Sequence, residues 1–218
     1  MDFNYNSTNR NNGGVIKMNQ EESKRDTIKN LALMTLIFLL VCVCFGLFLV
    51  IQENILYKII LNADAGVLEV SVDAQKATLN YNEASLAYED NDYNQVERSC
   101  RLARDYYFSE SQGYKKVSSE LRATGNNDKL ITLYLSQMGY LSDISTNMYE
   151  ACEHFESAAR YYDKYYLETT PADDPSYESG GEQIEMMNKK IEDHDRNVEA
   201  YNQILQDYRV ELEVRLGK

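Results

Sequence analysis

Apolar residues follow two different patterns along the chain. From Leu31 to Ile51 the sequence reads LALMTLIFLLVCVCFGLFLVI, which is 21 residues without a charge. As a helix this stretch is about 31 Å long, which matches the hydrocarbon core of a bilayer. We therefore expect a transmembrane helix over 30–52 that contacts membrane lipid through residues 31–51. A cleaved signal peptide is the alternative, but the apolar run is too long for one and no small-residue cleavage site follows it.

Beyond residue 52, apolar residues recur at alternating spacings of three and four. Such a 3.5-residue period is typical of helices that pack knobs-into-holes. Polar or Pro- and Gly-containing segments interrupt it at 89–92, 124–128 and 169–181. The pattern predicts four helices at about 53–89, 92–123, 129–168 and 182–216. Since short loops join antiparallel neighbours, we expect an all-α fold in which the transmembrane helix continues into an antiparallel up-down-up-down four-helix bundle over 53–218.

Each predicted helix carries one apolar stripe. In the first helix the stripe consists of Val67, Val70, Ala74, Ala77, Tyr81, Ala84 and Tyr88. In the second it consists of Tyr93, Val96, Cys100, Ala103, Tyr107, Glu110, Tyr114, Val117 and Leu121, and in the third of Leu130, Tyr134, Met138, Leu141, Ser145, Met148, Cys152, Phe155, Ala159, Tyr162 and Tyr166. In the fourth it consists of Ile184, Met187, Ile191, His194, Val198, Tyr201, Leu205, Tyr208 and Leu212. Three stripe positions across the bundle are polar, namely Glu110, Ser145 and His194. They could line a small ligand pocket, although a polar residue in a helix seam more often sets the register.

Two cysteines outside the apolar stretch occupy stripe positions on successive helices. In an antiparallel hairpin that turns near residue 126, residues at one height have numbers that add to about 252, and Cys100 with Cys152 satisfies this rule. We expect the two to face each other. In an oxidising compartment they would form a disulfide, and otherwise they would fill a core layer as small apolar thiols.

His194 lies between Asp193 and Asp195. A loop centred near residue 175 would place it level with Phe155 and Glu156, one turn from the cysteine layer. A zinc site of two cysteines and one histidine would need ligands much closer than one helical turn, so we favour a half-buried histidine with a carboxylate neighbour. We expect neither a metal nor another cofactor.

The distribution of charge orients the chain and excludes some partners. Lys17, Lys24, Arg25 and Lys29 precede the apolar stretch, while only Lys58 follows it closely. The positive-inside rule then places the N-terminus in the cytoplasm, with residues 1–29 as a disordered arm, and the bundle outside the cell membrane. Residues 52–218 carry 17 basic and 31 acidic side chains, so we expect no nucleic-acid partner.

No arrangement of catalytic residues stands out in the sequence, and we predict that the protein is not an enzyme. The chain has 18 tyrosines, and Tyr161, Tyr165 and Tyr177 are expected near the end of the bundle farthest from the membrane. Because tyrosine is enriched at interfaces, these three are candidates for binding a protein partner. The alternative is that they widen the apolar face of a thick bundle.

The predicted topology resembles the extracytoplasmic four-helix sensor of bacterial chemoreceptors. That resemblance implies a small-ligand sensor that signals through a partner, but it carries over no residue, and the second span and the signalling domain of those receptors have no counterpart here. The sequence favours a single-pass, membrane-anchored helical bundle that acts as a protein-interaction or envelope-structural module. The sensor is the alternative hypothesis.

Overall fold

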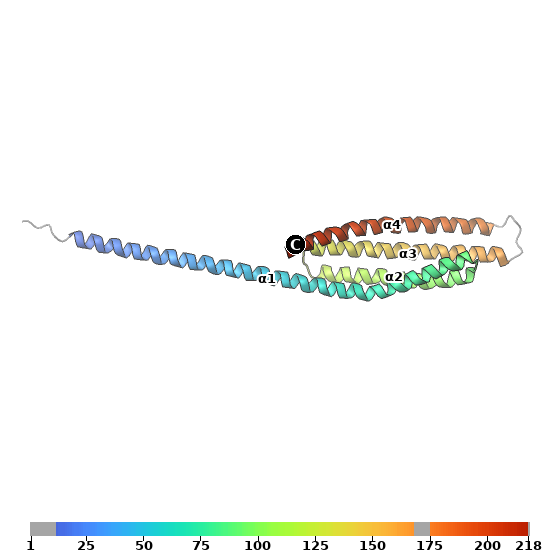
Figure 1. The fold of residues 1–218 in the computed structure, drawn as a ribbon, viewed down its shortest axis with the longest axis horizontal. Coiled ribbons are helices and arrows are strands. Elements are labelled where there is room, and N and C mark those ends of the chain that lie inside the picture. The colour runs from blue at the N-terminus through green and yellow to red at the C-terminus, as the bar shows by residue number, and fades with distance from the viewer. Residues whose placement is uncertain (1–11, 168–174, 218) are drawn as a thin grey trace, which may run out of the picture. The chain divides into compact units, whose positions relative to one another are not determined.

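A computed structural model describes the backbone of residues 12–167 and 175–217 and the side chains of 34–166 and 175–217. It contains four helices, which are α1 (Asn12–Glu89), α2 (Tyr93–Ala123), α3 (Lys129–Leu167) and α4 (Pro175–Leu216) (Figure 1). No strand occurs within these described ranges. The expected all-α fold is confirmed.

The chain divides into two compact units, residues 1–56 and 57–218, and α1 contributes to both. In the first unit the side chains from Met34 to Ile51 are exposed. This stretch, near the N-terminus, is long and apolar enough to cross a membrane. An exposed run of apolar side chains of this length is what a lipid-facing helix requires.

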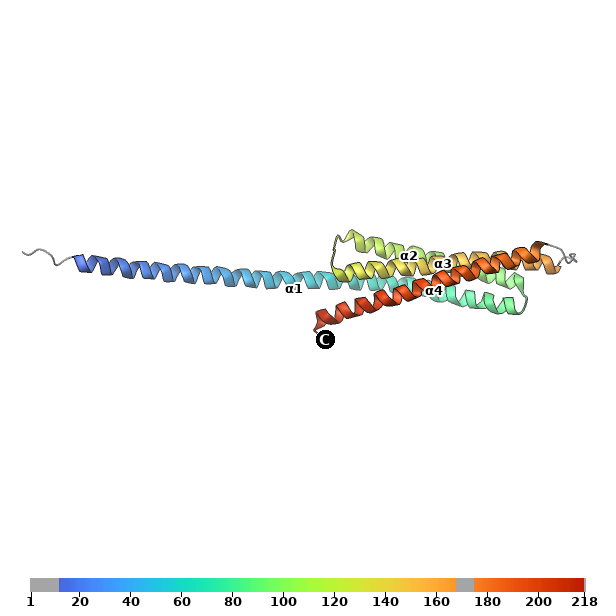
Figure 2. The same cartoon turned by 90° about the horizontal axis from the view of Figure 1, so that it is seen from above.

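The second unit is the helical bundle. Within it α3 packs against both α2 and α4, and Figure 2 shows α4 crossing α3 at an angle. Residues 57–89 of α1 complete the bundle. Ser109 Oγ on α2 donates a hydrogen bond to Asp73 Oδ2 over 2.7 Å, and Tyr134 Oη on α3 donates one to Asp64 Oδ1 over 2.6 Å.

The turns of the bundle follow from local sequence. Asp92 caps α2 by accepting a hydrogen bond from the backbone N–H of Gln95 at 3.0 Å, and Asn91 before it takes a positive φ of 58°. Gly125 after α2 has a φ of 63°, and Asp128 then accepts from the backbone N–H of Leu130 at 2.8 Å. Glycine and asparagine tolerate this left-handed region, and aspartate is a preferred N-cap.

Two segment boundaries differ from the sequence-based expectation. The first helix begins at Asn12, so residues 12–29, expected to be a disordered arm, are helical. The last helix begins at Pro175 and not near 182, so the predicted loop over 169–181 is wrong for 175–181, and its remainder lies outside the described residues. Proline fits the first turn of a helix because no intrahelical partner exists there for its missing N–H.

The earlier start of α4 changes its register against α3. His154 Nδ1 lies 2.9 Å from Gln183 Oε1, and Lys190 Nζ lies 2.5 Å from Glu150 Oε2. Residues of equal height on these helices therefore have numbers that add to about 340, and not to the 350 that a loop centred at 175 implies. His194 lies near the level of Asn147, so its predicted position beside Phe155 and Glu156 is wrong.

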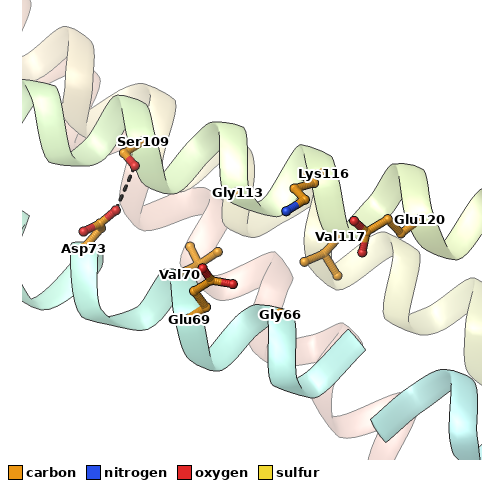
Figure 3. A pocket seen from close by; sticks show the side chains of 9 residues that line it. All are labelled: Gly66, Glu69, Val70, Asp73, Ser109, Gly113, Lys116, Val117 and Glu120. Carbon is orange, nitrogen blue, oxygen red and sulfur yellow. Dashed lines mark hydrogen bonds between the residues drawn. The ribbon is translucent and has the colours of Figure 1, made fainter. Parts of the chain in front are cut away.

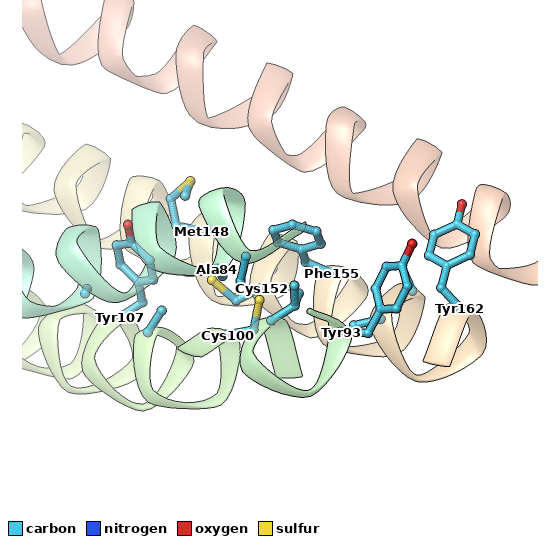
Figure 4. Packing of buried hydrophobic residues seen from close by; sticks show 14 residues of the cluster. Ala84, Tyr93, Cys100, Tyr107, Met148, Cys152, Phe155 and Tyr162 are labelled. Carbon is cyan, nitrogen blue, oxygen red and sulfur yellow. The ribbon is translucent and has the colours of Figure 1, made fainter. Parts of the chain in front are cut away.

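The core lies mainly between α1, α2 and α3 (Figure 4). Its centre holds both bundle cysteines, Phe155, and the fully buried alanines Ala77 and Ala84 of α1. The stripes predicted for α2 and α3 are mostly buried. The stripe predicted for α4 is only half-buried along its length, and among residues 175–217 only Ser176 and Gly180 are buried.

Two glycines bring α1 and α2 close together. A Cβ added to Gly66 would lie 2.8 Å from Val117 Cγ2, and one added to Gly113 would overlap the side chain of Val70. Each glycine thus receives a valine from the opposite helix. The backbones approach more closely at this crossing than larger residues would permit.

Candidate functional site

A groove runs between α1 and α2 beside the glycine crossing, with a cavity volume of about 240 Å³ (Figure 3). Its polar lining consists of Glu69, Asp73, Ser109, Lys116 and Glu120. The volume is below the 300–1,000 Å³ typical of ligand pockets, and two of its lining side chains, Asp73 and Ser109, already bond each other. The groove is therefore a by-product of close helix packing.

Glu110 and Ser145, two of the three polar stripe positions, belong to a buried polar layer of the bundle. Glu110 is 7% exposed and Ser145 is fully buried. Burial raises the pKa of the Glu110 carboxyl to about 7, and hydrogen bonds with Tyr114 and Ser145 oppose this shift. At neutral pH the group is thus partly protonated, and its polar partners come from within the bundle.

His194 is less deeply buried than Glu110 and Ser145. It is half-buried, and its Nδ1 lies 2.9 Å from Asp195 Oδ1. This is the carboxylate neighbour expected from the sequence. The neighbouring residues Asp193, Arg196 and Asn197 line a shallow surface pocket together with Asn147.

Cys100 and Cys152 are fully buried within one core cluster, and both thiols are free in the structure. Figure 4 shows the two sulfur atoms in the same region of the core. Burial raises the pKa of both thiols, that of Cys152 to about 12. Since the thiolate is the reactive form, these cysteines are poor nucleophiles and poor metal ligands in this state.

A charged network borders the cysteine layer. Glu156 on α3 is buried, and its Oε2 lies 3.0 Å from Arg104 Nη1 of α2. Arg160 also pairs with Glu156, and Arg101 pairs with Glu97 at 2.6 Å. Because a buried carboxylate needs cationic partners, this network ties α2 to α3.

No group of three or more His, Cys, Asp or Glu side chains able to hold a metal is found in the part of the chain that the structure describes.

Aromatic rings gather where α1 meets α2 and α3 approaches α4. We call this group the tip cluster, and its members are Tyr88, Tyr93, Tyr162, Tyr165, Tyr166 and Tyr177. The rings of Tyr93 and Tyr166 stack with centroids 5.7 Å apart, and Tyr177 contacts both Tyr162 and Tyr165. Gly180 permits this assembly, because a Cβ there would lie 2.8 Å from the Tyr162 ring.

The three tyrosines proposed from the sequence differ in exposure. Tyr161 is 39% exposed and Tyr177 is 52% exposed, while Tyr165 is half-buried among the other rings. Tyr166, which was not among the candidates, is exposed although it lies on the predicted core stripe. Its place in the last turn of α3 was the available signal, because a stripe loses its cover where its helix ends.

A groove of about 350 Å³ lies beside Tyr161, between α3 and α4. Its lining consists of Ser157, Arg160, Tyr161, Lys164 and Gln183, which combines two cations and an aromatic ring with no carboxylate. On a chain with a net charge of −13 this is a local reversal of sign. Arginine and tyrosine are also the side chains most enriched where proteins bind each other.

Comparison with known proteins gives no relative from which to infer a function. No family model, curated protein or solved structure matches this chain.

Proposed function

We propose that this protein is a single-pass membrane protein whose helical bundle lies outside the cytoplasm and binds another protein through the tip of the bundle. The observation that carries the proposal is the exposure of Tyr177, whose ring contacts those of Tyr162 and Tyr165, together with the exposure of Tyr161 next to Tyr162 in the chain. A tyrosine ring that is held by other rings and still exposed offers contact area at a small entropic cost.

The position of the tip suits this role. The tip cluster lies at the end of the bundle opposite Tyr57, where the bundle segment of α1 begins. An anchor through residues 31–51 would place the tip at the far end of the bundle segment, about 50 Å along α1 from residue 57. A partner approaching from outside would meet this surface first.

The chemistry beside the tip indicates the partner. The groove next to Tyr161 presents Arg160 and Lys164, whereas residues 52–218 as a whole are strongly acidic. Glu156 and Glu97 hold the Arg160 guanidinium in place. A partner segment with carboxylate and aromatic or apolar side chains complements this surface, because it would pair with the Lys164 ammonium and stack on the rings.

The sensor hypothesis has less support. Its candidate pocket residues, Glu110 and Ser145, are buried and bonded within the bundle, and His194 pairs with Asp195. A ligand at this layer would have to displace internal hydrogen bonds before making its own, which lowers its affinity.

The proposal is tested by capture from native membranes. Full-length protein carrying Tyr161→Ala and Tyr177→Ala is cross-linked in intact cells and purified beside the wild type. The matched control is Phe108→Ala, which removes an exposed aromatic ring from α2, away from the tip. We expect the tip variant to lose a specific cross-linked protein that the wild type and the Phe108→Ala variant retain. The same cross-linked proteins in all three samples would refute binding at the tip.

The orientation is tested separately with a protease added to intact cells from which the outer cell envelope has been removed. We expect cleavage after Lys or Arg of the bundle, with a tag at residue 1 remaining protected. Protection of both ends would refute the proposed orientation.

A further inference from the structure

The four leucines in the bundle segment of α1, which are Leu61, Leu68, Leu79 and Leu86, all face solvent. Leu68 is 71% exposed and Leu79 is 69% exposed, while Ala77 and Ala84 on the inner face are fully buried. Leucine is among the residue types most often buried, so a row of exposed leucines along one helix is informative where a single exposed leucine would not be. The exposed leucines therefore have no role in the core of this bundle.

These leucines belong to a second heptad pattern. We call it the outer seam, and it consists of Leu61, Ala65, Leu68, Val72, Gln75, Leu79, Asn82 and Leu86. Its members alternate at spacings of four and three residues, and all eight are exposed. They precede or follow the inner positions Ala63, Val70, Ala77 and Ala84 by two residues. Two residues correspond to about 200° around a helix, so the outer seam lies opposite the inner face.

The outer seam contains no charged residue over residues 61–86, although the chain has a net charge of −13. Six of its eight positions are apolar, and the remaining two are the amides Gln75 and Asn82. Apolar a and d positions sustained over more than three heptads are typical of a coiled-coil seam, and a polar residue in such a seam fixes the register. A shallow, mostly apolar depression beside it is lined by Ala74, Gln75, Thr78 and Leu79.

We infer that the outer seam pairs with the outer seam of a second copy of this chain in a parallel two-stranded coiled coil. The inference rests on the membrane anchor of the proposed function. Copies anchored through residues 31–51 leave the membrane in the same chain direction, so their outer seams are parallel. In the matched register each leucine meets its own counterpart, and Asn82 meets Asn82, where two amides can bond each other.

The residues that lie directly beside the outer seam, one position before or after its members, permit this pairing. Across a parallel dimer the facing pairs are Asp64 with Glu69, Ser71 with Lys76, and Thr78 with Glu83. Two of these pairs set a hydroxyl against a charged group, which can form a hydrogen bond. The third brings two carboxylates together, but Asp64 already accepts a hydrogen bond from Tyr134 Oη within its own bundle. Most acidic residues of the bundle lie on α2, α3 and α4. In a dimer that pairs through α1, these helices of one copy stay apart from those of the other copy.

The extent of the seam indicates how the dimer is held. Residues 61–86 form about 39 Å of helix, and at a width of about 10 Å this strip covers roughly 400 Å² on each partner. Standard interfaces bury about 800 Å² per partner, so the seam alone is a weak interface. Anchoring both copies in one membrane raises their effective concentration, which makes a weak parallel seam sufficient.

Cysteine cross-linking in membranes tests the inference. In full-length protein with Cys42→Ser and Cys44→Ser, a single cysteine is introduced as Leu68→Cys or Leu79→Cys, and as Glu199→Cys on exposed α4 for the control. Facing seam positions in a parallel dimer come within the roughly 7 Å between Cα atoms that a disulfide needs. We expect mild oxidation to give at least about ten times more disulfide dimer at the two seam positions than at residue 199, a difference of about 1.4 kcal/mol.

A second variant changes the seam without introducing a cysteine there. Leu68→Glu with Leu79→Glu places four carboxylates in the seam of a dimer, whereas both side chains are exposed in the single bundle. We expect unchanged helix content and thermal unfolding in detergent, but at least about tenfold less dimer by amine cross-linking in membranes. Equal dimer in this variant, or equal disulfide at residue 199, would overturn the inference.

The two proposals fail separately. Loss of seam cross-linking with the tip-dependent partner retained would refute only the dimer. The protease experiment could contradict the orientation while cross-linking at the outer seam persists. That result would refute the orientation and support the dimer, because both copies still run through the membrane in the same chain direction. The Leu68→Cys and Leu79→Cys variants can also be produced together in one membrane. If disulfides between the two variants then exceed disulfides between identical copies, parallel pairing would be refuted.

Discussion

The α2–α3 hairpin and α4 carry apolar stripes of the same period but bury them to different depths. The α2 and α3 stripes include fully buried residues such as Val96, Cys100 and Cys152, while every residue of the predicted α4 stripe is half-buried. A 3.5-residue period therefore shows which face of a helix is apolar. The number of neighbouring helices around that face decides how much of it is covered.

The chemistry of the two regions follows this difference in depth. Between α2 and α3, polar groups are buried and paired, as in Glu156 with Arg104. Polar contacts of α4 lie nearer the surface, such as Arg215 Nη2 with Asp128 Oδ1 at 2.9 Å and Lys129 Nζ with Glu211 Oε2 at 2.7 Å. We expect α4 to be the helix of the bundle that detaches first.

Replacing Phe155 by alanine should have the largest effect on the deep core. Phe155 is buried, and its ring centroid lies 5.4 Å from that of Tyr88 and 6.2 Å from that of Tyr81. Removing a buried aromatic side chain leaves a cavity and costs about 3–5 kcal/mol. Urea unfolding of the full-length protein in detergent, followed by circular dichroism, measures this change. A cost below about 1 kcal/mol would contradict the distinction between deep and shallow layers.

The Glu110→Gln variant should show a pH-dependent effect of about 3 kcal/mol. The folded-state pKa of about 7 lies above the ordinary value of 4.5, so the folded state binds this proton more tightly than the unfolded state does. The contribution of Glu110 to stability is therefore fully present below pH 4.5, and up to about 3 kcal/mol of it is lost as the pH rises from 4.5 through 7. Glutamine stays neutral, so the variant should exceed the wild type in stability at pH 8 and match it at pH 4.5.

Unfolding curves of both proteins at pH 4.5 and pH 8 check this result. The matched control is Glu120→Gln, which alters an exposed carboxyl on the same helix. A constant difference between wild type and Glu110→Gln at both pH values would show that burial does not shift this group.

The Gly113→Ala variant tests the close crossing of α1 and α2. The added Cβ would overlap the Val70 side chain, so the helices would have to move apart, at a cost of about 1–3 kcal/mol. Gly139→Ala is the control, because a Cβ there meets nothing within 4 Å and alanine favours a helix by about 1 kcal/mol. Thermal unfolding in detergent should therefore move in opposite directions for the two variants. Stabilisation by both would mean that the crossing is looser than described.

The smallest change is expected on α4. Leu205 is half-buried, so truncation to alanine should cost about 1 kcal/mol, well below the 2–5 kcal/mol of a fully buried leucine. Hydrogen exchange of the wild type sharpens the comparison, because backbone amides of 182–216 should exchange faster than those of 130–160. Equal protection of the two segments would place α4 in the same cooperative unit as α3.

Local residue types account for most of what could be predicted about the fold. The caps at Asp92 and Asp128 and the turn at Gly125 mark helix ends, and Leu31–Ile51 is uncharged over its whole length. These signals act within a few residues, so they can be read without knowledge of the fold. The start of α4 was not predicted correctly, because a segment with a proline and two glycines looks like a loop until α3 is present to pack against it.

The candidate sites were predicted less completely. Tyr161, Tyr165 and Tyr177 were expected near the tip, and two of them, Tyr161 and Tyr177, are exposed. The position of His194 was not predicted correctly, because an error in loop length changes the register of the whole of α4. The outer seam was also missed. It has the same heptad spacing as the inner stripe of α1, and a search for a second stripe two residues out of phase would have found it.

The sequence by itself determined that this chain forms long helices with an uncharged stretch near one end, because helix periodicity and hydrophobic length are properties of the chain alone. Only the tertiary structure showed that the inner stripe of α1 is covered while the outer seam of the same helix stays exposed. The reason is steric, since glycine and alanine let α1 lie close against α2 and α3, whereas leucines on that face would have kept the helices apart.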